Sequence, residues 1–482
     1  MSAQRMEASF RDPAGFVFRR EGVVHRQVNR SYQQEFDLLH RSGLYDDLTA
    51  DGLLVPHEEV DVRLAMSEGA YRVIRPAQLP FVSYPYEWCF GQLKHAALAT
   101  LQVLRKALAY GMTLKDASAY NVQWLGGRPV FIDTLSFERY REGEPWRAYR
   151  QFCGHFLAPL ALMVLRDPRL GKLLRVHLDG VPLDLACRLL PWHAMLKPSL
   201  LLHLFLHARS QQQYETTCRR QDHGNPVEPE ADLPSTKSTS SKDGQRGRFS
   251  RLAFEGLIGS LERAIYGLRL RSAQTAWSDY YTATHNYGAE GLAQKTHAVR
   301  QLLEQIRPEA VWDLGANSGA FSRLAAECGA KMVVAWDADH ACVEANYRQA
   351  QEQRESAILP LLLDLTNPSP GLGWAGSERQ SMTERGPADA VLALGLVHHM
   401  AIANNVPLGE VAGYIKRLGR WLIIEWVPKT DSQVRRLLAS RDDIFPQYER
   451  AAFEREFEAR YAIERCLAIE GTQRSVYLMK AR

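Results

Sequence analysis

Short apolar runs alternate with amphipathic stretches along the second half of this chain. Five of these runs are typical of buried strands, and they lie at residues 310–314, 331–336, 358–363, 390–394 and 421–425. Between them, apolar residues recur every three or four positions, as they do on one face of a helix. Strands and helices in alternation predict a doubly wound, mostly parallel α/β sheet, which binds ligands beyond the carboxyl ends of its strands.

The first half of the chain has a different pattern, with one long amphipathic helix between short hairpins. Apolar residues at helical spacing run from Gln92 to Ala109. A hairpin is predicted at 122–133, with Gly126 and Gly127 at its turn, and another at 16–28. The amino-terminal part is therefore expected to be an α+β domain.

Residues 211–250 separate these two patterns. The segment is rich in Ser, Thr, Pro, Gly and charge and has almost no apolar periodicity, so it cannot repay the entropy cost of ordering. We predict a disordered linker between an amino-terminal module at 10–210 and a carboxy-terminal module at 251–482, and we expect it to permit relative motion. Residues 252–306 predict a helical extension ahead of the sheet.

Composition and charge narrow the function classes. The 482 residues are 46% hydrophobic and 24% charged, and the formal net charge of +4 includes no block of like charge suited to nucleic acid. The seven cysteines are scattered and never spaced CxxC, which argues against a disulfide framework or a thiolate zinc site. The start of the chain lacks a secretory signal and the apolar runs are too short to span a bilayer, so a cytoplasmic protein is expected.

A glycine-rich turn follows the first strand of the predicted sheet. The strand contains Asp313, and the turn, Gly315-Ala-Asn317-Ser-Gly319, leads into an amphipathic helix. Glycines let a ligand approach the backbone, and the helix start offers free amide groups. Asp337 ends the second strand, where an acid can hold ribose hydroxyls. The turn lacks the G-x-G-x-x-G spacing of a dinucleotide-binding dehydrogenase.

The series DLGANSG, VVAWDAD, LLLDL and LALGLVHHM resembles the motifs of class I S-adenosylmethionine-dependent methyltransferases. The resemblance covers about 275–482 and implies a Rossmann-like fold with S-adenosylmethionine as its cofactor. It implies that Asp337 binds the ribose, that Asp364 lies near the adenine, and that the methionine part is approached by Asp313, Gly315, Asn317 and Gly319. Asn317 stands where the commonest pattern has a glycine.

The catalytic residues are less sharply indicated. His398 and His399 follow the fourth strand, where this family positions acceptors, and His399 is the preferred general base. Alternatively, the two histidines only shape the pocket wall. Glu425 ends the fifth strand and either orients an acceptor or caps a loop. Methyl transfer is an in-line displacement, so alignment can supply much of the rate without a dedicated base. Residues 425–448 also resemble a bacterial subset that includes rhizobial nodulation methyltransferase-like proteins.

The amino-terminal module resembles protein-kinase-like and small-molecule phosphotransferase folds. The resemblance rests on a D-x-x-x-x-N loop from Asp116 to Asn121 and on Asp133 after the following hairpin. It implies that Asp116 is a catalytic acid and that Asn121 and Asp133 hold Mg²⁺ with ATP. Residues 79–88 would then be the hinge between two lobes.

The chain departs from the kinase pattern at several points. Leu114 stands where a His is usual, Thr134-Leu135 replaces Phe-Gly, and no clear glycine-rich loop or strand lysine is found, with Arg26 or Arg30 as poor substitutes. A pseudokinase that presents a nucleotide or an acceptor is one alternative. Another is an unrelated helical module in which Asp116 caps a turn and Asp133 lies in a surface loop.

Three functions are compatible with these patterns. The leading hypothesis is methyl transfer from S-adenosylmethionine to an oxygen or nitrogen atom of a small-molecule or glycan acceptor. The second is a bifunctional kinase and methyltransferase that acts on one acceptor. The third is a non-catalytic scaffold that binds S-adenosylmethionine. No clear nucleic-acid signal and no membrane span is predicted.

Overall fold

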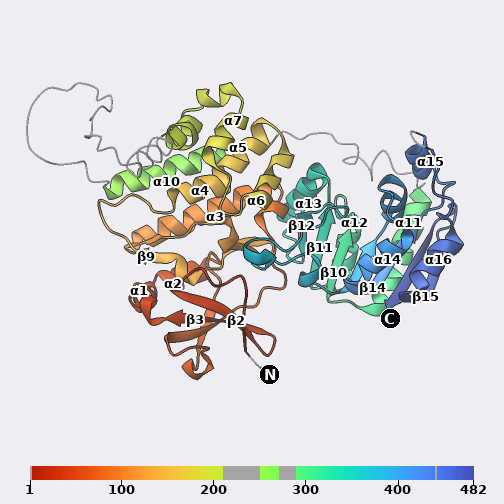
Figure 1. Cartoon of the computed structure of the whole chain (residues 1–482), viewed down its shortest axis with the longest axis horizontal. Coiled ribbons are helices and arrows are strands. Elements are labelled where there is room, and N and C mark those ends of the chain that lie inside the picture. Colours follow the sequence, from red (N-terminus) through yellow and green to blue (C-terminus); the bar gives the residue numbers. More distant parts are fainter. Residues whose placement is uncertain (1–2, 210–249, 271–288, 440–441) are drawn as a thin grey trace, which may run out of the picture.

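The computed structural model describes residues 3–209, 250–270, 289–439 and 442–482. Almost all of the predicted linker lies outside the described residues. The described parts form two modules that lie side by side along the longest axis of the molecule (Figure 1). No helix among the described residues is both long enough and apolar enough to cross a membrane.

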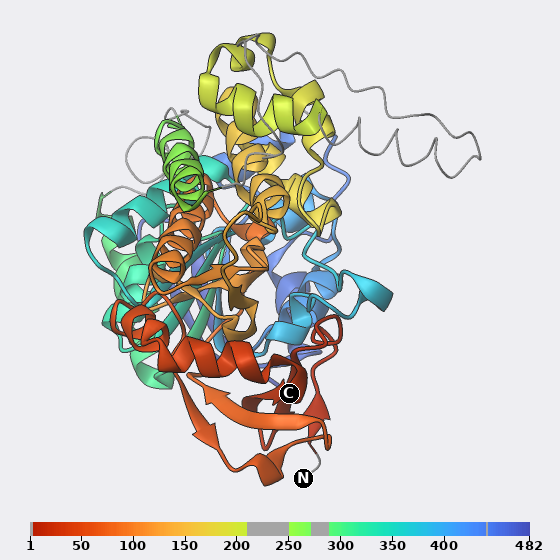
Figure 2. The same ribbon diagram turned by 90° about the vertical axis from the view of Figure 1, so that its left-hand side faces the viewer.

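A five-stranded antiparallel sheet forms one end of the amino-terminal module (Figure 2). Its order is β1-β2-β3-β5-β4, with β1 (Gln4–Arg5), β2 (Gly15–Arg20), β3 (Val23–Asn29), β4 (His57–Val60) and β5 (Ala70–Pro76). The predicted hairpin at 16–28 is confirmed as β2–β3, and its tight turn places Glu21 and Gly22 at positive φ. Phe36 of helix α1 (Gln33–Arg41) packs on the sheet, and helix α2 (Leu44–Ala50) follows.

Helix α3 (Phe90–Ala109) runs through the rest of this module. Its buried residues recur every three or four positions, as the sequence predicts, and they face the elements that surround the helix. The second predicted hairpin is confirmed as β7 (Val122–Leu125) and β8 (Arg128–Phe131), and β6 (Met112–Leu114) pairs with β9 (Phe137–Arg139). Short helices complete the module: α4 (Tyr149–Phe152), η6 (Cys153–Leu157), α5 (Ala158–Leu165), η7 (Pro168–Lys172), α6 (Leu173–Val176), α7 (Leu183–Leu189), η8 (Trp192–Leu196), α8 (Pro198–Leu200) and η9 (Leu201–Leu206).

The carboxy-terminal module is a Rossmann-like α/β domain with a mostly parallel sheet. Five strands are parallel in the order β12-β11-β10-β13-β14, and antiparallel β16 and β15 complete the sheet beside β14. The strands are β10 (Ala310–Leu314), β11 (Met332–Asp337), β12 (Ile358–Leu362), β13 (Ala388–Ala393), β14 (Gly419–Trp426), β15 (Tyr461–Ala468) and β16 (Ser475–Ala481). The helices are α11 (Ala289–Ile306), α12 (Ala320–Glu327), α13 (His340–Glu352), η13 (His399–Ala403), α14 (Leu408–Lys416), α15 (Ser432–Leu438) and α16 (Arg450–Glu458).

The connection from β12 to β13 lacks the helix that usually joins parallel strands. Residues 363–387, all of them described, contain only the short turns η11 (Trp374–Gly376) and η12 (Thr383–Arg385). Part of that sheet face is covered instead by the amino-terminal module. The ring of Phe81 meets the rings of Trp312 and Trp336 edge to face, with centroids 5.8 Å apart in both cases.

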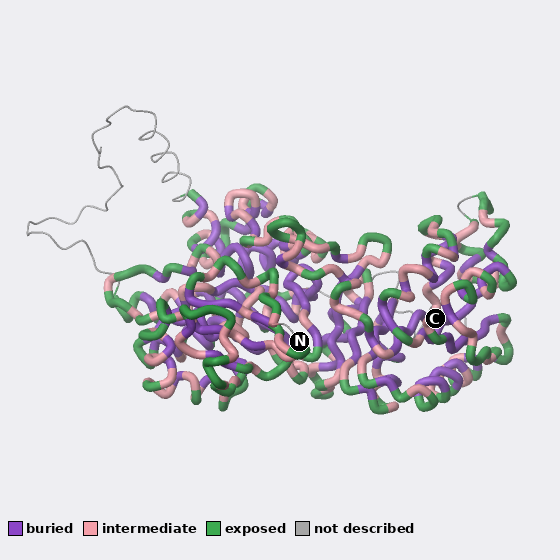
Figure 3. The backbone as a smooth tube through the Cα atoms, turned by 60° about the horizontal axis from the view of Figure 1, so that its bottom comes forward, coloured by how far each residue is buried: buried purple, intermediate pink, exposed green. Residues whose placement is uncertain are grey.

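Polar contacts fix the two modules against each other. Arg385 and Glu87, each 2% exposed, form a bidentate pair, with Nη1–Oε2 at 2.8 Å and Nη2–Oε1 at 2.5 Å. Gly91 N at the start of α3 donates to Glu344 Oε2 of α13 over 2.8 Å. Buried backbone is seen in both modules and where they meet (Figure 3), and one apolar cluster extends across the contact. A continuous core of this kind opposes the relative motion expected from the linker.

Helix α10 (Arg251–Tyr266) lies on the amino-terminal module, although the predicted boundaries place its residues in the carboxy-terminal one. Lys94 Nζ of α3 donates to Leu268 O over 2.8 Å, and Arg105 of α3 pairs with Glu262 of α10 over 2.6 Å. Phe254 and Ile258 are buried in the same apolar cluster as α3. The helix therefore returns to the amino-terminal module before the chain enters the sheet domain.

Candidate functional site

The predicted glycine turn lies at the carboxyl edge of the parallel sheet, between β10 and α12. Gly315, Asn317 and Gly319 have φ of +76°, +51° and +85°, a region that favours glycine. The N–H groups of Gly315 and Ala316 both donate to Trp336 O at 2.9 Å, so the turn is fastened to β11. A Cβ on Gly319 would lie 2.4 Å from Asn346 Oδ1, which leaves no room for a side chain there.

Asp313 lies inside β10 and is 2% exposed. Ser322 Oγ of α12 donates to its Oδ2 over 2.7 Å. Burial raises the pKa of this carboxyl to about 6, and the charge of Asp337 acts in the same direction, while the Ser322 hydrogen bond and Lys295 oppose the shift. Asp313 therefore supplies buried negative charge directly beneath the glycine turn.

Asp337 ends β11 and faces the same turn. Asn317 N donates to its Oδ2 over 2.7 Å, and Asp339 N donates to its Oδ1 over 2.8 Å. Burial raises the pKa of Asp337 to about 6, and these backbone donors oppose the shift. The N–H of Ala338 is a third backbone donor, so the carboxylate, which has about four lone-pair sites, retains acceptor capacity for a ribose hydroxyl.

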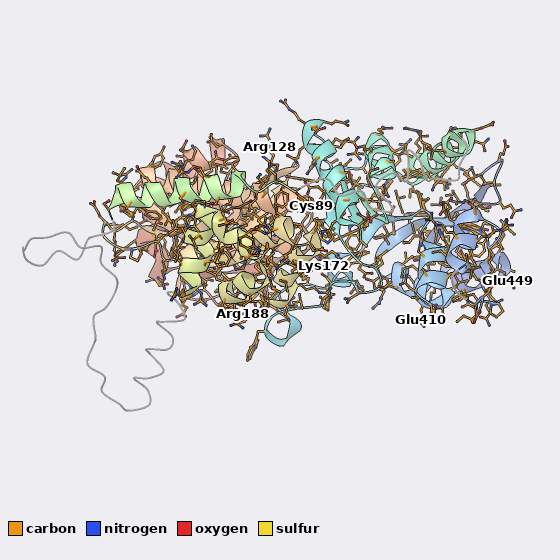
Figure 4. All side chains as sticks on the ribbon, turned by 90° about the horizontal axis from the view of Figure 1, so that it is seen from above. Cys89, Arg128, Lys172, Arg188, Glu410 and Glu449 are labelled. Atoms are coloured by element: carbon orange, nitrogen blue, oxygen red, sulfur yellow. The ribbon has the colours of Figure 1, made fainter. Side chains whose placement is uncertain are left out.

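Asp364 follows β12 at the same edge, one strand further out. Leu363 N donates to Asp337 O over 2.8 Å, which ties the two strand ends together, and Asp364 Oδ1 accepts from Thr366 N and Oγ1. The amino-terminal module holds the loop that follows, because Arg175 Nη2 donates to Pro368 O over 3.0 Å. Lys172, three residues before Arg175, is labelled in Figure 4 at the contact between the two modules.

The two predicted histidines differ in their surroundings. His398 is 3% exposed, and burial lowers its pKa well below the usual range, with smaller contributions from His399 and Arg474. His399 begins η13 and is only partly buried, and burial lowers its pKa as well. The rings lie with centroids 4.2 Å apart. Both imidazoles are therefore neutral near pH 7, and His399 is the more accessible of the two.

Glu425 is fully buried at the end of β14 and lies between two cations. Lys295 Nζ lies 2.8 Å from its Oε2, and Arg474 Nη1 lies 3.5 Å from its Oε1. Arg474 also pairs with Asp431 over 2.8 Å. The carboxylate is thus part of a buried charge network. The sequence predicts two other roles for Glu425, orienting an acceptor or capping a loop, and does not predict this one.

Lys295 was not identified from the sequence as a site residue, although the sequence contains a signal for it. It lies on α11 in helical register with Leu292, Val299 and Leu302, which pack in the apolar core. A lysine on the apolar stripe of a helix requires a buried anion, because an unpaired buried charge is costly. Burial lowers the pKa of Lys295, and Glu425 opposes the shift.

The three residues of the kinase-like resemblance lie near one another in the amino-terminal module. Ser136 Oγ donates to Asp133 Oδ2 and accepts from Asn121 Nδ2 at 3.2 Å, so it bridges these two residues. Asp116 Oδ1 accepts from Ser118 N over 2.9 Å. Burial raises the pKa of Asp116, and the charge of Asp133 contributes to the increase.

Arg26 on β3 reaches the same cluster, with Nη2 2.5 Å from Asp133 Oδ1. A guanidinium therefore neutralises the carboxylate that the resemblance assigns to Mg²⁺. No group of three or more His, Cys, Asp or Glu side chains that could hold a metal ion occurs in the described ranges. The binding of ATP and Mg²⁺ therefore remains a prediction.

Sequence comparison identifies a relative along almost the whole chain. Nodulation protein NoeA of Rhizobium meliloti (strain 1021) is 36% identical over 476 residues, which cover 98% of this chain and 95% of that protein. The chain belongs to the NoeA family. No family model matches the chain. The similarity to NoeA therefore covers both modules and not only the sheet domain.

Solved structures resemble parts of this NoeA-family chain, with low sequence identity and low TM-scores. Magnesium protoporphyrin IX methyltransferase (ChlM) from Synechocystis PCC 6803 with bound SAH is 18% identical, covering 42% of this chain and 98% of that chain, with a TM-score of 0.30. The methyltransferase domain of bacterial CtHen1-CN is 15% identical, with coverages of 39% and 99% and a TM-score of 0.29. WbdD is 15% identical, with coverages of 45% and 46% and a TM-score of 0.29.

Proposed function

We propose that this NoeA-family chain is a methyltransferase that uses S-adenosylmethionine and methylates an oxygen or nitrogen atom of a small-molecule or glycan acceptor. The observation that carries the proposal is the meeting of Asp313, the glycine turn and Asp337 at the carboxyl edge of the parallel sheet. Ligands of such sheets bind at this edge.

The residues at this edge fit the cofactor. Gly315 and Gly319 allow the positive φ values of the turn, and Asp337 retains acceptor capacity for a ribose hydroxyl. Asp313 and Asp337 supply negative charge, which favours a ligand with cationic sulfonium and ammonium groups. When bound, S-adenosylmethionine supplies an electrophilic methyl group on a cationic sulfur.

The acceptor side is assigned to the segment after β13. Neutral His399 can accept the proton that an acceptor hydroxyl or amine loses as its oxygen or nitrogen takes up the methyl group. His398, more deeply buried, supports the ring of His399. Glu425 is assigned a positioning role through its pairs with Lys295 and Arg474, because its carboxylate is enclosed by them.

Calorimetric titration of the full chain with S-adenosylmethionine and S-adenosylhomocysteine tests the proposal. Wild-type protein is expected to bind both ligands, and Asp337→Asn to bind each at least about tenfold more weakly, because hydrogen bonds to a charged group contribute about 1.5–3 kcal/mol. Asp389→Asn is the matched control, since Asp389 accepts from Glu309 N and Ala310 N at the start of β10, at the opposite edge. Absence of binding by wild-type protein would overturn the proposal.

A second candidate function concerns the amino-terminal module, which we assign to nucleotide binding in a kinase-like domain. The proximity of Asp116, Asn121 and Asp133 favours it, and the hydrogen bonds through Ser136 support the grouping. The Arg26–Asp133 pair favours binding without phosphoryl transfer, because it neutralises a carboxylate that Mg²⁺ would need.

Titration with ATP, with and without Mg²⁺, separates these roles. Binding that is independent of Mg²⁺, without ADP formation, is expected for a nucleotide-binding module. ADP formation that requires Asp116 and Asp133 would instead establish the bifunctional enzyme. Absence of ATP binding under both conditions would remove the candidate and would leave methyl transfer untouched.

A further inference from the structure

A cavity of about 540 Å³ is lined entirely by residues of the amino-terminal module. Its volume is within the range of small-molecule sites. It is lined by two stretches of chain, at 147–154 and 176–183. The first stretch comprises α4 and the beginning of η6, and the second runs from the end of α6 to the start of α7.

The cavity wall carries more positive than negative charge. Arg147, Arg150 and His177 line it, with Asp179 as the acidic residue of the wall. The charge of Asp179 also acts on Arg11, whose pKa is raised chiefly by its hydrogen bond to Glu378. Asp179 therefore lies near Arg11 as well as in the cavity wall, so its negative charge interacts with both.

The two arginines of the wall are available to a ligand. Arg147 is 76% exposed and lies 4.0 Å from Glu138, the limit of an ion pair. No ion pair of Arg150 is found within the described part of the chain. Guanidinium groups match the oxygens of a phosphate in geometry and charge and often bind them through two parallel hydrogen bonds.

Gln151 connects this cavity to the loop that carries Asp116. Its Oε1 accepts from Ala117 N at 2.7 Å, and its side chain also hydrogen-bonds Asp116. Because Gln151 lines the cavity as well, it lies between a molecule bound there and Asp116. An amide side chain is suited to contact a hydroxyl-rich neutral group, since it offers both a donor and an acceptor.

The floor of the cavity is backbone held by hydrogen bonds, and it requires glycine at position 180. Val181 N donates to Gly154 O over 2.9 Å, and Gly180, with φ +95°, closes a turn through its N–H to His177 O at 3.1 Å. A Cβ on Gly180 would lie 2.9 Å from the carbonyl carbon of Gly154. Gly154 belongs to the π-helical turn η6, a form that is frequent at functional sites.

We infer that this cavity binds a phosphate-bearing small molecule of about the size of a hexose phosphate. Arg147 and Arg150 hold the phosphate, and Gln151 contacts the neutral part next to Asp116. The inference does not depend on methyl transfer, because the cavity lies in the other module. It gives the amino-terminal module a ligand class of its own.

Calorimetry on the full chain, with inorganic phosphate, glucose 6-phosphate and glucose as probes, tests the inference. Wild-type protein is expected to bind the two phosphates, with affinity that falls as salt is raised, and not glucose. The double variant R147A/R150A is expected to weaken glucose 6-phosphate binding by more than about tenfold, since it removes both guanidinium groups that hold the phosphate.

Arg188→Ala provides the matched control. Arg188, labelled in Figure 4, is an exposed arginine of α7 that pairs with Asp184, and it is not among the residues that line the cavity. It is expected to change phosphate affinity by less than about twofold, as for most surface substitutions. An unchanged midpoint of denaturant unfolding for R147A/R150A, relative to the wild type, shows that the variant remains folded.

A further variant tests the shape of the cavity. Gly180→Ala is expected to abolish glucose 6-phosphate binding, because the added methyl group displaces the floor against Gly154. Three results would overturn the inference: absence of phosphate binding by wild-type protein, equal binding of glucose and glucose 6-phosphate, or unchanged affinity in R147A/R150A.

Discussion

Each module pairs a cation with a carboxylate at a position that the sequence marks as functional, yet the two pairs differ in burial. Glu425 is 0% exposed, and its partners Lys295 and Arg474 are 3% and 2% exposed. Arg26 and Asp133 are 13% and 14% exposed. Water reaches the second pair and is excluded from the first.

Burial determines what each pair can do. Breaking a buried pair leaves a charge without water, so the Glu425 network acts as a structural support at the carboxyl end of β14. A partly exposed pair loses less when it opens, because water or a ligand can replace either partner. The Arg26–Asp133 pair is therefore the one that a nucleotide or a metal ion could open.

The largest expected effect is on stability, from Glu425→Ala. Removing this carboxylate leaves Lys295 buried without its anion and should lower the free energy of unfolding by about 3–5 kcal/mol. Denaturant unfolding measures the change. Glu327→Ala, which removes the partly exposed partner of Arg300, should cost less than about 1 kcal/mol. Equal losses in the two variants would contradict the support role.

The next effect concerns turnover. His399→Gln should lower the rate of S-adenosylhomocysteine formation, measured with a metabolite extract as the acceptor source, by about 100-fold if His399 is the base. Binding of S-adenosylmethionine should be preserved, because His399 lies on the assigned acceptor side. A wild-type rate in His399→Gln would restrict the histidine to shaping the pocket wall.

A smaller effect is expected from pH. Because burial raises the pKa values of Asp313 and Asp337 to about 6, the folded apo chain binds protons more readily than the unfolded chain. The stability from these carboxyls is thus fully present below about pH 4 and is lost as pH rises through 6. Affinity for S-adenosylmethionine should change in the opposite sense and rise about tenfold between about pH 5 and pH 7.

The control for the pH effect is Asp337→Asn, which removes one of the two titrating groups. The pH dependence of its S-adenosylmethionine affinity should be weaker than that of the wild type, when both are measured by calorimetry at the same pH values. A wild-type affinity that does not change across this window would show that neither carboxyl controls binding.

The smallest effect is expected from Asp133→Ala. Because the pair with Arg26 is partly exposed, its loss should lower the free energy of unfolding by no more than about 1 kcal/mol. Denaturant unfolding next to Glu425→Ala makes the comparison direct. A loss as large as that of Glu425→Ala would mean that both pairs are structural supports and that the amino-terminal cluster cannot open to a ligand.

Much of the sheet domain could be predicted from local pattern. The strands at 310–314 and 358–363, the glycine turn and the position of Asp337 all follow from periodicity and turn chemistry within about thirty residues of chain. Carboxylates that follow parallel strands meet at one edge for geometric reasons, so their grouping required no knowledge of distant contacts. The hairpins at 16–28 and 122–133 were predictable for the same reason.

Other features depend on contacts between residues far apart in the chain. Arg474 has no local pattern that marks it as a partner of Glu425, and nothing near Arg385 indicates that Glu87 neutralises it. Helix α10 has the periodicity of an amphipathic helix, which predicts the helix but not the module on which its apolar face packs. The boundary predicted at residue 250 failed to anticipate this packing.

The sequence by itself determined five strands of the parallel sheet, the long helix α3, two hairpins and the grouping of residues at the carboxyl edge, because each depends on short-range periodicity and backbone geometry. The tertiary structure alone decided which charges are buried together, that the amino-terminal module covers the sheet face where a crossover helix is missing, and that Arg147 and Arg150 line one cavity. Those features depend on burial and proximity across long sequence separations, which no local pattern encodes.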